Sequence, residues 1–239
     1  MPSTDAMAAP GSPAPQGGAT QPADATPTAN AANPTQRSKA KENRRQALLT
    51  AAASLFAMNG FNRVSLEDLG AAAGVSGPAV YRHFPGKQAV LADLLVTVSR
   101  ELLEGGRRVV DTSPDPETAL RRLVAFQVDF AVGKPDVIRV QDRDLSNLSE
   151  EDQATVRALQ RSYVELWVDV LAQLQPGTDS SELRMRAHAT FGLINSTPHS
   201  VRSHGRRIAA ATARPLLEGM ALAALTVAAG PAAGQELMP

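Results

Sequence analysis

A short cluster of side chains, Tyr81, Arg82, His83 and Lys87, stands just behind the turn-forming sequence Gly-Val-Ser-Gly-Pro. The chain has only 4 His and 2 Tyr, so this cluster is a local concentration of groups that can bind charge. Arg can hold a guanine edge through two parallel hydrogen bonds, while Tyr, His and Lys suit phosphate oxygens. These residue types therefore favour the binding of a polyanion.

The charge distribution along the chain agrees with this interpretation. The formal net charge is +0, but residues 37–88 hold eight Lys or Arg against three acidic residues, a net of +5. The rest of the chain is slightly acidic. A basic module joined to a larger acidic region suits a nucleic acid, and a basic helix surface that is merely solvated is the alternative.

Other chemistries have less support in the sequence. The chain contains no Cys, which excludes disulfides, thiolate zinc sites, iron–sulfur clusters and a cysteine nucleophile. His188 and His199 have helical spacing, but the sequence shows no further ligands converging on them. It also lacks a Ser-His-Asp elbow and a phosphate-binding glycine loop. We therefore expect no enzyme activity, no metal and no cofactor.

The sequence also predicts where the protein acts. The N-terminus has neither the basic nor the apolar region of an export signal. The most apolar stretch, 216–233, is interrupted by Glu218 and by Gly230-Pro231, so it does not suit a bilayer. We expect a cytoplasmic protein with no membrane partner.

Apolar residues recur with helical periodicity, and no segment alternates as a strand would, so the pattern predicts an all-α fold. Four helices are expected first, from about Lys41 to Gly60, Ser65 to Gly74, Ser76 to about Phe84, and Lys87 to about Val110. Others follow over about 115–132, 136–145, 149–174, 179–204 and 207–229, where Pro198 and Pro215 each mark a kink or a boundary.

The spacing of Gly70, Gly74 and Val80 predicts two helices that cross over a tight turn. Such a crossing needs a small residue where the second backbone comes close, a Gly able to adopt positive φ at the turn, and an apolar residue beneath the second helix. The three positions supply these properties in this order. We therefore expect a helix-turn-helix, with an ordinary pair of helices in a bundle as the alternative.

The sequence LLTAAASLFAMNGFNRVSLEDLGAAAGVSGPAVYRHFPGKQAVLADLL resembles the DNA-binding module of the TetR family of bacterial transcriptional regulators. Its AGVS and YRHFPGK segments match the family's signature, although Gly70 stands where the family usually has Ala. The resemblance implies a helix-turn-helix DNA-binding domain over 37–88 and a ligand-binding and dimerisation domain over 89–230. Disordered tails are expected over 1–36 and 231–239.

The resemblance and the chemistry of the side chains assign compatible roles in DNA binding. The third helix would lie in the major groove with Gly77, Pro78 and Ala79 leading, where few donors favour contact with thymine methyls and readout of DNA shape. Arg82 suits direct readout of guanine. The phosphate contacts would come from Tyr81, His83, Ser65, Ser76, Lys87, Arg44 and Arg45.

Several of these residues have simpler interpretations. Tyr81 suits a core position with its hydroxyl in water, and His83 suits a helix cap. Lys87 and the charge run that contains Arg44 and Arg45 suit a solvated surface equally well.

One helix-turn-helix reads too few base pairs for a genomic site, so we expect a homodimer on a pseudo-palindromic double-stranded DNA operator. The last two helices are rich in Ala, Gly, Leu and Met, and the final one is apolar nearly all round. In TetR-like proteins these two helices pair with those of the second subunit. A wholly intramolecular core is the alternative.

The middle helices carry most of the aromatic residues, and the resemblance implies an apolar pocket among them. The candidate pocket residues are Phe126, Phe130, Tyr163, Trp167 and Phe191, with Arg139 and Asn195 as polar groups. Core packing of the aromatics and a surface ion-pair network around Arg139 are the alternatives. By analogy with similar regulators, the expected effector is a hydrophobic small molecule of the acyl-CoA type.

Together, these patterns predict a ligand-responsive dimeric repressor that a hydrophobic effector releases from its operator. Two other functions remain open, a transcriptional activator of the same architecture and a helical interaction protein without DNA binding.

Overall fold

The computed structural model describes residues 34–200, 202–203 and 206–227. Its helices are α1 (Pro34–Asn59), α2 (Leu66–Ala72), α3 (Gly77–Tyr81), α4 (Lys87–Asp111), α5 (Pro116–Gly133), α6 (Pro135–Asp144), α7 (Glu150–Leu174), α8 (Ser180–Asn195), α9 (Thr197–Ser200) and α10 (Ala210–Thr226). Short 3-10 turns, Phe61–Arg63 and Leu145–Asn147, complete the helical part. The all-α prediction is confirmed, apart from an antiparallel pair of two-residue strands, β1 (Arg202–Ser203) and β2 (Arg206–Arg207).

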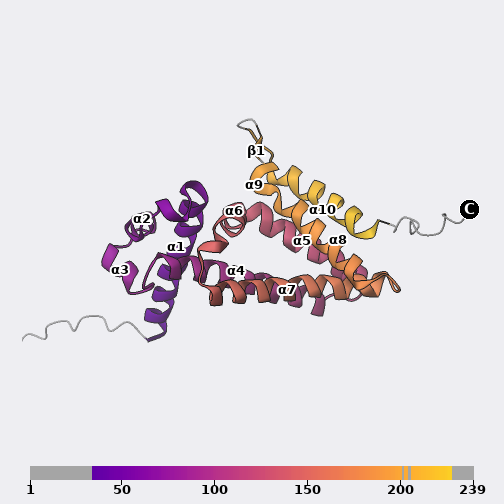
Figure 1. The fold of residues 1–239 in the computed structure, drawn as a ribbon, viewed down its shortest axis with the longest axis horizontal. Helices are drawn as coiled ribbons and strands as arrows, with labels where there is room; N and C mark the ends of the chain where they lie inside the picture. Colours follow the sequence, from indigo (N-terminus) through magenta and orange to yellow (C-terminus); the bar gives the residue numbers. More distant parts are fainter. Residues whose placement is uncertain (1–33, 201, 204–205, 228–239) are drawn as a thin grey trace, which may run out of the picture.

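Helices α1, α2 and α3 form a head at one end of the molecule, and α5 to α10 form a body (Figure 1). Helix α4 connects them and lies along α7 through the body. Among the described residues, no helix is both long enough and apolar enough to cross a membrane.

Each part has its own cluster of buried apolar side chains. The head cluster joins α1, α2, α3 and the first half of α4, and it also takes in residues of α6 and of the start of α7. The body cluster joins the second half of α4 to α5, α7, α8 and α10. Leu102 and Phe130 pack against both clusters, so they mark the junction between them.

Two adjacent glycines of α4 allow close helix packing in the body. A Cβ at Gly105 would lie 2.3 Å from Cζ of Phe126 on α5, and one at Gly106 would lie 2.6 Å from Cε2 of Tyr163 on α7. A larger residue at either position would force the neighbouring ring or α4 itself to move.

Several predicted boundaries differ from the structure. Helix α1 begins at Pro34, inside the stretch that we expected to be a tail, whereas residues 1–33 and the second predicted tail lie outside the described residues. Helix α3 ends at Tyr81 instead of near Phe84, because Arg82 and His83 form a turn ahead of Pro85 and Gly86.

The segment predicted as helical over 179–204 is divided at a boundary next to Pro198, one of the two outcomes expected there, and its last residues are not helical. Helix α8 ends at Asn195, and α9 then begins with Pro198 in its first turn, where a missing N–H removes no helical hydrogen bond. The hairpin follows, and α10 begins only at Ala210. Pro215 lies inside α10 and does not end it.

Candidate nucleic-acid interface and effector region

The α2–α3 corner has the geometry that the spacing of its residues predicts. Gly74 has φ +67°, which L side chains rarely adopt, and Val80, on the inner face of α3, is fully buried. A Cβ at Gly70 would lie 2.9 Å from Cγ2 of Val80 and 3.0 Å from the carbonyl oxygen of Val75. The two helices approach so closely here that position 70 has room for glycine but not for the alanine that the family usually has.

The start of α2 is fixed by a capping box. The Ser65 hydroxyl oxygen accepts a hydrogen bond of 3.0 Å from the Asp68 N–H, while the Asp68 carboxylate accepts bonds from the hydroxyl and the N–H of Ser65. These bonds lower the pKa of Asp68. Both donors of Ser65 are thus used within the head, so a phosphate contact from Ser65 would have to compete with the cap.

The corner presents several predicted contact residues to the outside. The Tyr81 side chain is 55% exposed, which removes the core interpretation, and Arg82, Ser76 and Pro78 are exposed as well. Gly77 and Ala79 are half-buried. Helices α2 and α3 lie at the end of the molecule away from α10 (Figure 1).

His83 follows this corner and lies near the part of α1 that carries Lys41, Arg44 and Arg45. Its Nδ1 is buried and has no hydrogen-bond partner in the described part of the chain. Burial lowers the pKa of His83, and the positive charges of Lys41, Arg44, Arg82 and Arg45 lower it further. Four cations from two separate segments are therefore close enough to act on one imidazole, and they form a common basic region.

Two predicted phosphate contacts have partners within the protein. Arg45 forms an ion pair with Asp93 of α4 and another, at 3.2 Å, with Glu42. Lys87 donates a hydrogen bond of 3.4 Å to the carbonyl oxygen of Asn62, and its Nζ lies 4.5 Å from the centre of the Phe61 ring. Arg44 is exposed, so it remains the more available of the two arginines in the charge run.

Arg143 joins the body to the head, a role that the sequence reasoning missed. From α6 its guanidinium donates hydrogen bonds to the carbonyl oxygens of Phe56 and Ala57 at the end of α1. The buried carboxylate of Asp144 accepts two more from it, at 3.1 and 2.9 Å, which raises the pKa of Arg143. The predicted polar ligand group Arg139, by contrast, donates to the carbonyl oxygen of Pro198 at 3.1 Å.

The structure brings three of the predicted pocket aromatics together in the body. The Tyr163, Trp167 and Phe191 rings pack with centroids 4.9 to 6.1 Å apart. Phe126 packs against Gly105, and Phe130 lies at the junction of the two clusters.

A buried polar chain runs through this aromatic group. The Tyr163 hydroxyl donates to Oε1 of Gln127 at 3.2 Å, and Nε2 of Gln127 donates to Oδ1 of Asn195 at 3.0 Å. Burial strongly raises the pKa of Tyr163, so its hydroxyl stays protonated. Sequence reasoning identified Asn195 and Tyr163 but missed Gln127, whose signal is a polar residue on the apolar face of α5. Nearby on α8, the buried Thr190 hydroxyl has no partner in the described residues.

Metal ligands do not gather in this part of the protein. Within the described residues, no group of three or more His, Asp or Glu side chains is placed to hold a metal ion.

A helix-turn-helix head connected by one long helix to a larger helical body is the architecture of a two-domain DNA-binding regulator. Comparison with known proteins gives the same result. Residues 48–94 match the family described as "Bacterial regulatory proteins, tetR family", and residues 113–222 match "Tetracyclin repressor-like, C-terminal domain". The chain belongs to the TetR family of bacterial transcriptional regulators.

Individual relatives are more distant. The HTH-type transcriptional repressor KstR2 of Rhodococcus jostii is 26% identical over 152 residues, which are 63% of this chain and 74% of that protein. The nucleoid occlusion factor SlmA of Vibrio cholerae is 31% identical over 101 residues, 42% of this chain and 52% of its own length. A TetR-family regulator from Bordetella parapertussis has a solved structure with TM-score 0.67 and 27% identity, covering 77% of this chain and 95% of its own.

Proposed function

We propose that this protein is a dimeric, ligand-responsive repressor that binds a pseudo-palindromic DNA operator through α3. The observation that carries the proposal is the exposure of Tyr81 and Arg82 on a correctly formed helix-turn-helix, next to the cations Lys41, Arg44 and Arg45 of α1. In this arrangement Arg82 reads a guanine in the major groove, while Tyr81 and Arg44 hold phosphates.

The proposed dimer forms through α8 and α10, which pack side by side in the body. Met185 on α8 and Leu216 and Met220 on α10 are 64%, 56% and 48% exposed, which is unusual for large apolar side chains. Burying them against a second copy would remove this apolar surface from water and set two heads on one face of the DNA.

The proposed effector is a hydrophobic small molecule bound in the body near the Tyr163–Gln127–Asn195 chain. Apolar rings with a few fixed polar groups are typical of ligand pockets. Two structural neighbours support acyl-CoA thioesters as the first class to test, FadR of Bacillus subtilis in complex with stearoyl-CoA and AibR in complex with isovaleryl coenzyme A and operator DNA.

The test is selection of bound duplexes from random DNA, followed by titration of the selected sequence. We expect Arg82→Ala to weaken binding about 5- to 150-fold, as the loss of one bidentate base contact does. The control is Arg157→Ala, which removes an exposed arginine of α7 in the body. Equal binding by both variants, or no enriched sequence, would contradict the proposal, and release by acyl-CoA thioesters tests the effector class separately.

A further inference from the structure

Helix α1 is longer than the packing of the head requires. Its first buried residues are Leu48 and Leu49, and the side chains described between residues 36 and 47 add nothing to the head cluster. In Figure 1 the first turns of α1 project past α2 and α3. The family match of the head also begins only at residue 48. We call residues 36–47 the overhang of α1, and packing gives no reason for it.

The overhang continues the inward side of α1 with basic residues in place of apolar ones. Leu48, Ala52 and Phe56 are fully buried and follow one another at intervals of four residues. Arg44 precedes Leu48 by four residues and Lys41 precedes it by seven, so both lie on the same side of the helix as Leu48. The side of α1 that enters the core of the head therefore becomes basic where the helix runs past that core.

Lys41 and Arg44 are available to a binding partner. Both side chains are exposed, and within the described part of the chain neither forms a hydrogen bond or an ion pair. Arg45, which stands next to them, is instead held by Asp93 and Glu42. Two cations on this side of the overhang are thus left without a countercharge.

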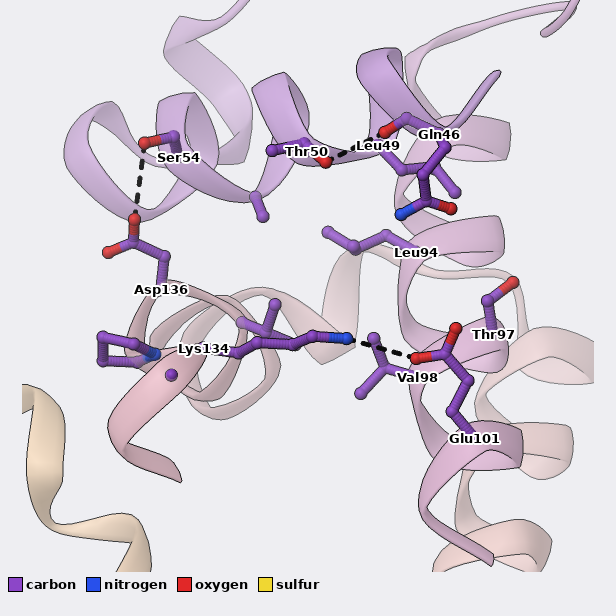
Figure 2. Close-up of a pocket in the computed structure, with 14 residues that line it drawn as sticks. Gln46, Leu49, Thr50, Ser54, Leu94, Thr97, Val98, Glu101, Lys134 and Asp136 are labelled. Atoms are coloured by element: carbon purple, nitrogen blue, oxygen red, sulfur yellow. Dashed lines mark hydrogen bonds and ion pairs between the residues drawn. The ribbon is translucent and has the colours of Figure 1, made fainter. Parts of the chain in front are cut away.

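The charged groups beside the middle of α1 are, by contrast, matched in pairs. At the cavity between α1, α4 and the turn that joins α5 to α6, Lys134 pairs with Oε2 of Glu101 at 3.2 Å (Figure 2). Asp136 accepts a hydrogen bond of 3.3 Å from the Ser54 hydroxyl and lies 4.0 Å from Nη1 of Arg139. Matched charges give this cavity no preference for a charged ligand, whereas the overhang favours an anion.

The two free cations lie near the recognition corner. Burial is the main cause that lowers the pKa of His83, and the positive charges of Lys41 and Arg44 are the next two. Both cations are therefore close to the imidazole, and His83 comes two residues after the end of α3. A polyanion that lies against α3 would pass within reach of the overhang.

The charges of the overhang do not stabilise α1 itself. Lys41 and Arg44 are three residues apart on one side of the helix, where like charges repel. The overhang also buries none of its described side chains, and a short helical segment without tertiary packing is marginal in water. A partner with negative charge would offset both costs.

From this arrangement we propose that Lys41 and Arg44 form a phosphate clamp, which binds the DNA backbone beside the groove that α3 enters. The clamp rests on the proposed operator binding and adds Lys41 to its contacts. Contacts with phosphate fix the position of a protein on the duplex and read no base. The clamp therefore adds affinity for any duplex and no preference for a sequence.

The test is the salt dependence of duplex binding by the full-length protein, followed by fluorescence anisotropy. Two labelled duplexes are compared, the selected operator and a scrambled sequence of the same length and composition. Each bound cation contributes about 0.9 to the slope of log affinity against log salt concentration, so Lys41→Gln should lower the slope by about 1.8 for a dimer. Between about 50 and 200 mM salt, this variant should lose about 12-fold less affinity than the parent. The change should be the same on both duplexes.

Lys39→Gln is the matched control. Lys39 is an exposed lysine of the same overhang, but it lies about 200° around the helix axis from Lys41. Both variants remove one positive charge, so an effect of net charge alone would appear in both. We expect Lys39→Gln and Lys41→Arg to keep the slope of the parent. Arg82→Ala should instead weaken binding to the operator more than binding to the scrambled duplex.

Three results would overturn the clamp. They are an unchanged slope in Lys41→Gln, equal changes of slope in Lys41→Gln and Lys39→Gln, and a loss that is confined to the operator. The operator-binding proposal survives each of them if Arg82→Ala still lowers the preference for the operator. If no operator is selected, the scrambled duplex alone decides on the clamp, and absence of binding to any duplex would overturn both proposals.

Discussion

The head and the body of this protein are held in shape by different kinds of constraint. In the α2–α3 corner of the head, backbone geometry is the constraint, because Gly74 has a positive φ and Gly70 leaves no space for a Cβ. In the body, large side chains such as Trp167 and Tyr163 fill the interior, and a chain of hydrogen bonds crosses it. The α2–α3 corner of the head therefore depends on a few local residues, whereas the body depends on contacts between distant helices.

The largest effect should come from emptying the body's aromatic group. Trp167 is fully buried, so Trp167→Ala should lower the free energy of unfolding by about 3–5 kcal/mol. Urea titration followed by far-UV circular dichroism measures the change. A loss below about 1 kcal/mol would mean that the body repacks around the cavity, and the contrast with the head would fail.

The next effect concerns the connection between the two regions. Arg143→Met leaves the carboxylate of Asp144, which is 6% exposed, without its guanidinium partner. We expect the free energy of unfolding to fall by about 1–3 kcal/mol. The loss is smaller than for a fully buried pair because the Arg143 side chain is 42% exposed.

Adding Asp144→Asn to that variant should recover part of the loss, because the amide needs no countercharge. A double-mutant cycle by urea unfolding measures the coupling. Additive losses would show that Arg143 acts on the end of α1 without Asp144.

A smaller effect tests the backbone constraint in the head. Gly74→Ala should lower the free energy of unfolding by about 1 kcal/mol. The strain of an L side chain at positive φ outweighs the small gain from a less flexible unfolded chain. Gly192 of α8 is the matched control, since a Cβ there meets nothing within 4 Å and no positive φ is present. Gly192→Ala should instead raise the free energy of unfolding by about 0.5–1 kcal/mol. The same sign for both changes in thermal unfolding would refute the comparison.

The smallest effect is the pH dependence that His83 gives to the head. Its pKa in the folded protein lies below the ordinary value of 6.5, so the unfolded chain binds a proton more readily. Stability should therefore fall as the pH drops below about 6.5 and should be unaffected by His83 well above it. The measurement is the midpoint of urea unfolding as a function of pH, which His83→Gln should make flatter below about pH 6.5. The control is His188→Gln, at an exposed site on α8.

The sequence predicted the head better than the body for a physical reason. Ser65, Gly70, Gly74 and Val80 act on neighbours a few residues away, so their spacing carried the information. The contact of Arg143 with Ala57 spans 86 residues, and local patterns hold no trace of it. The end of α3 was misplaced because Arg82 and His83 have no property that forbids another helical turn.

In the body, the sequence predicted the extents of three helices better than the contacts between them. The periodicity of apolar residues predicted the extents of α5, α6 and α7 closely, because each helix buries one face. It did not predict that Gln127 completes a hydrogen-bond chain with Tyr163 and Asn195, since that depends on how three helices meet. The predicted roles of these residues in effector binding stay predictions.

The glycine pair of α4 gives this helix the proportions of a lever. Gly105 and Gly106 press against rings of α5 and α7 and form its fulcrum, while its other end, at Lys87, follows α3 in the head and contacts the turn that precedes α2. From Lys87 to Gly105 the helix spans about 27 Å at 1.5 Å per residue, so each degree of tilt at the fulcrum displaces the far end by about 0.5 Å. A tilt of a few degrees about these glycines would therefore displace the head end of α4 by an amount comparable to an atomic radius.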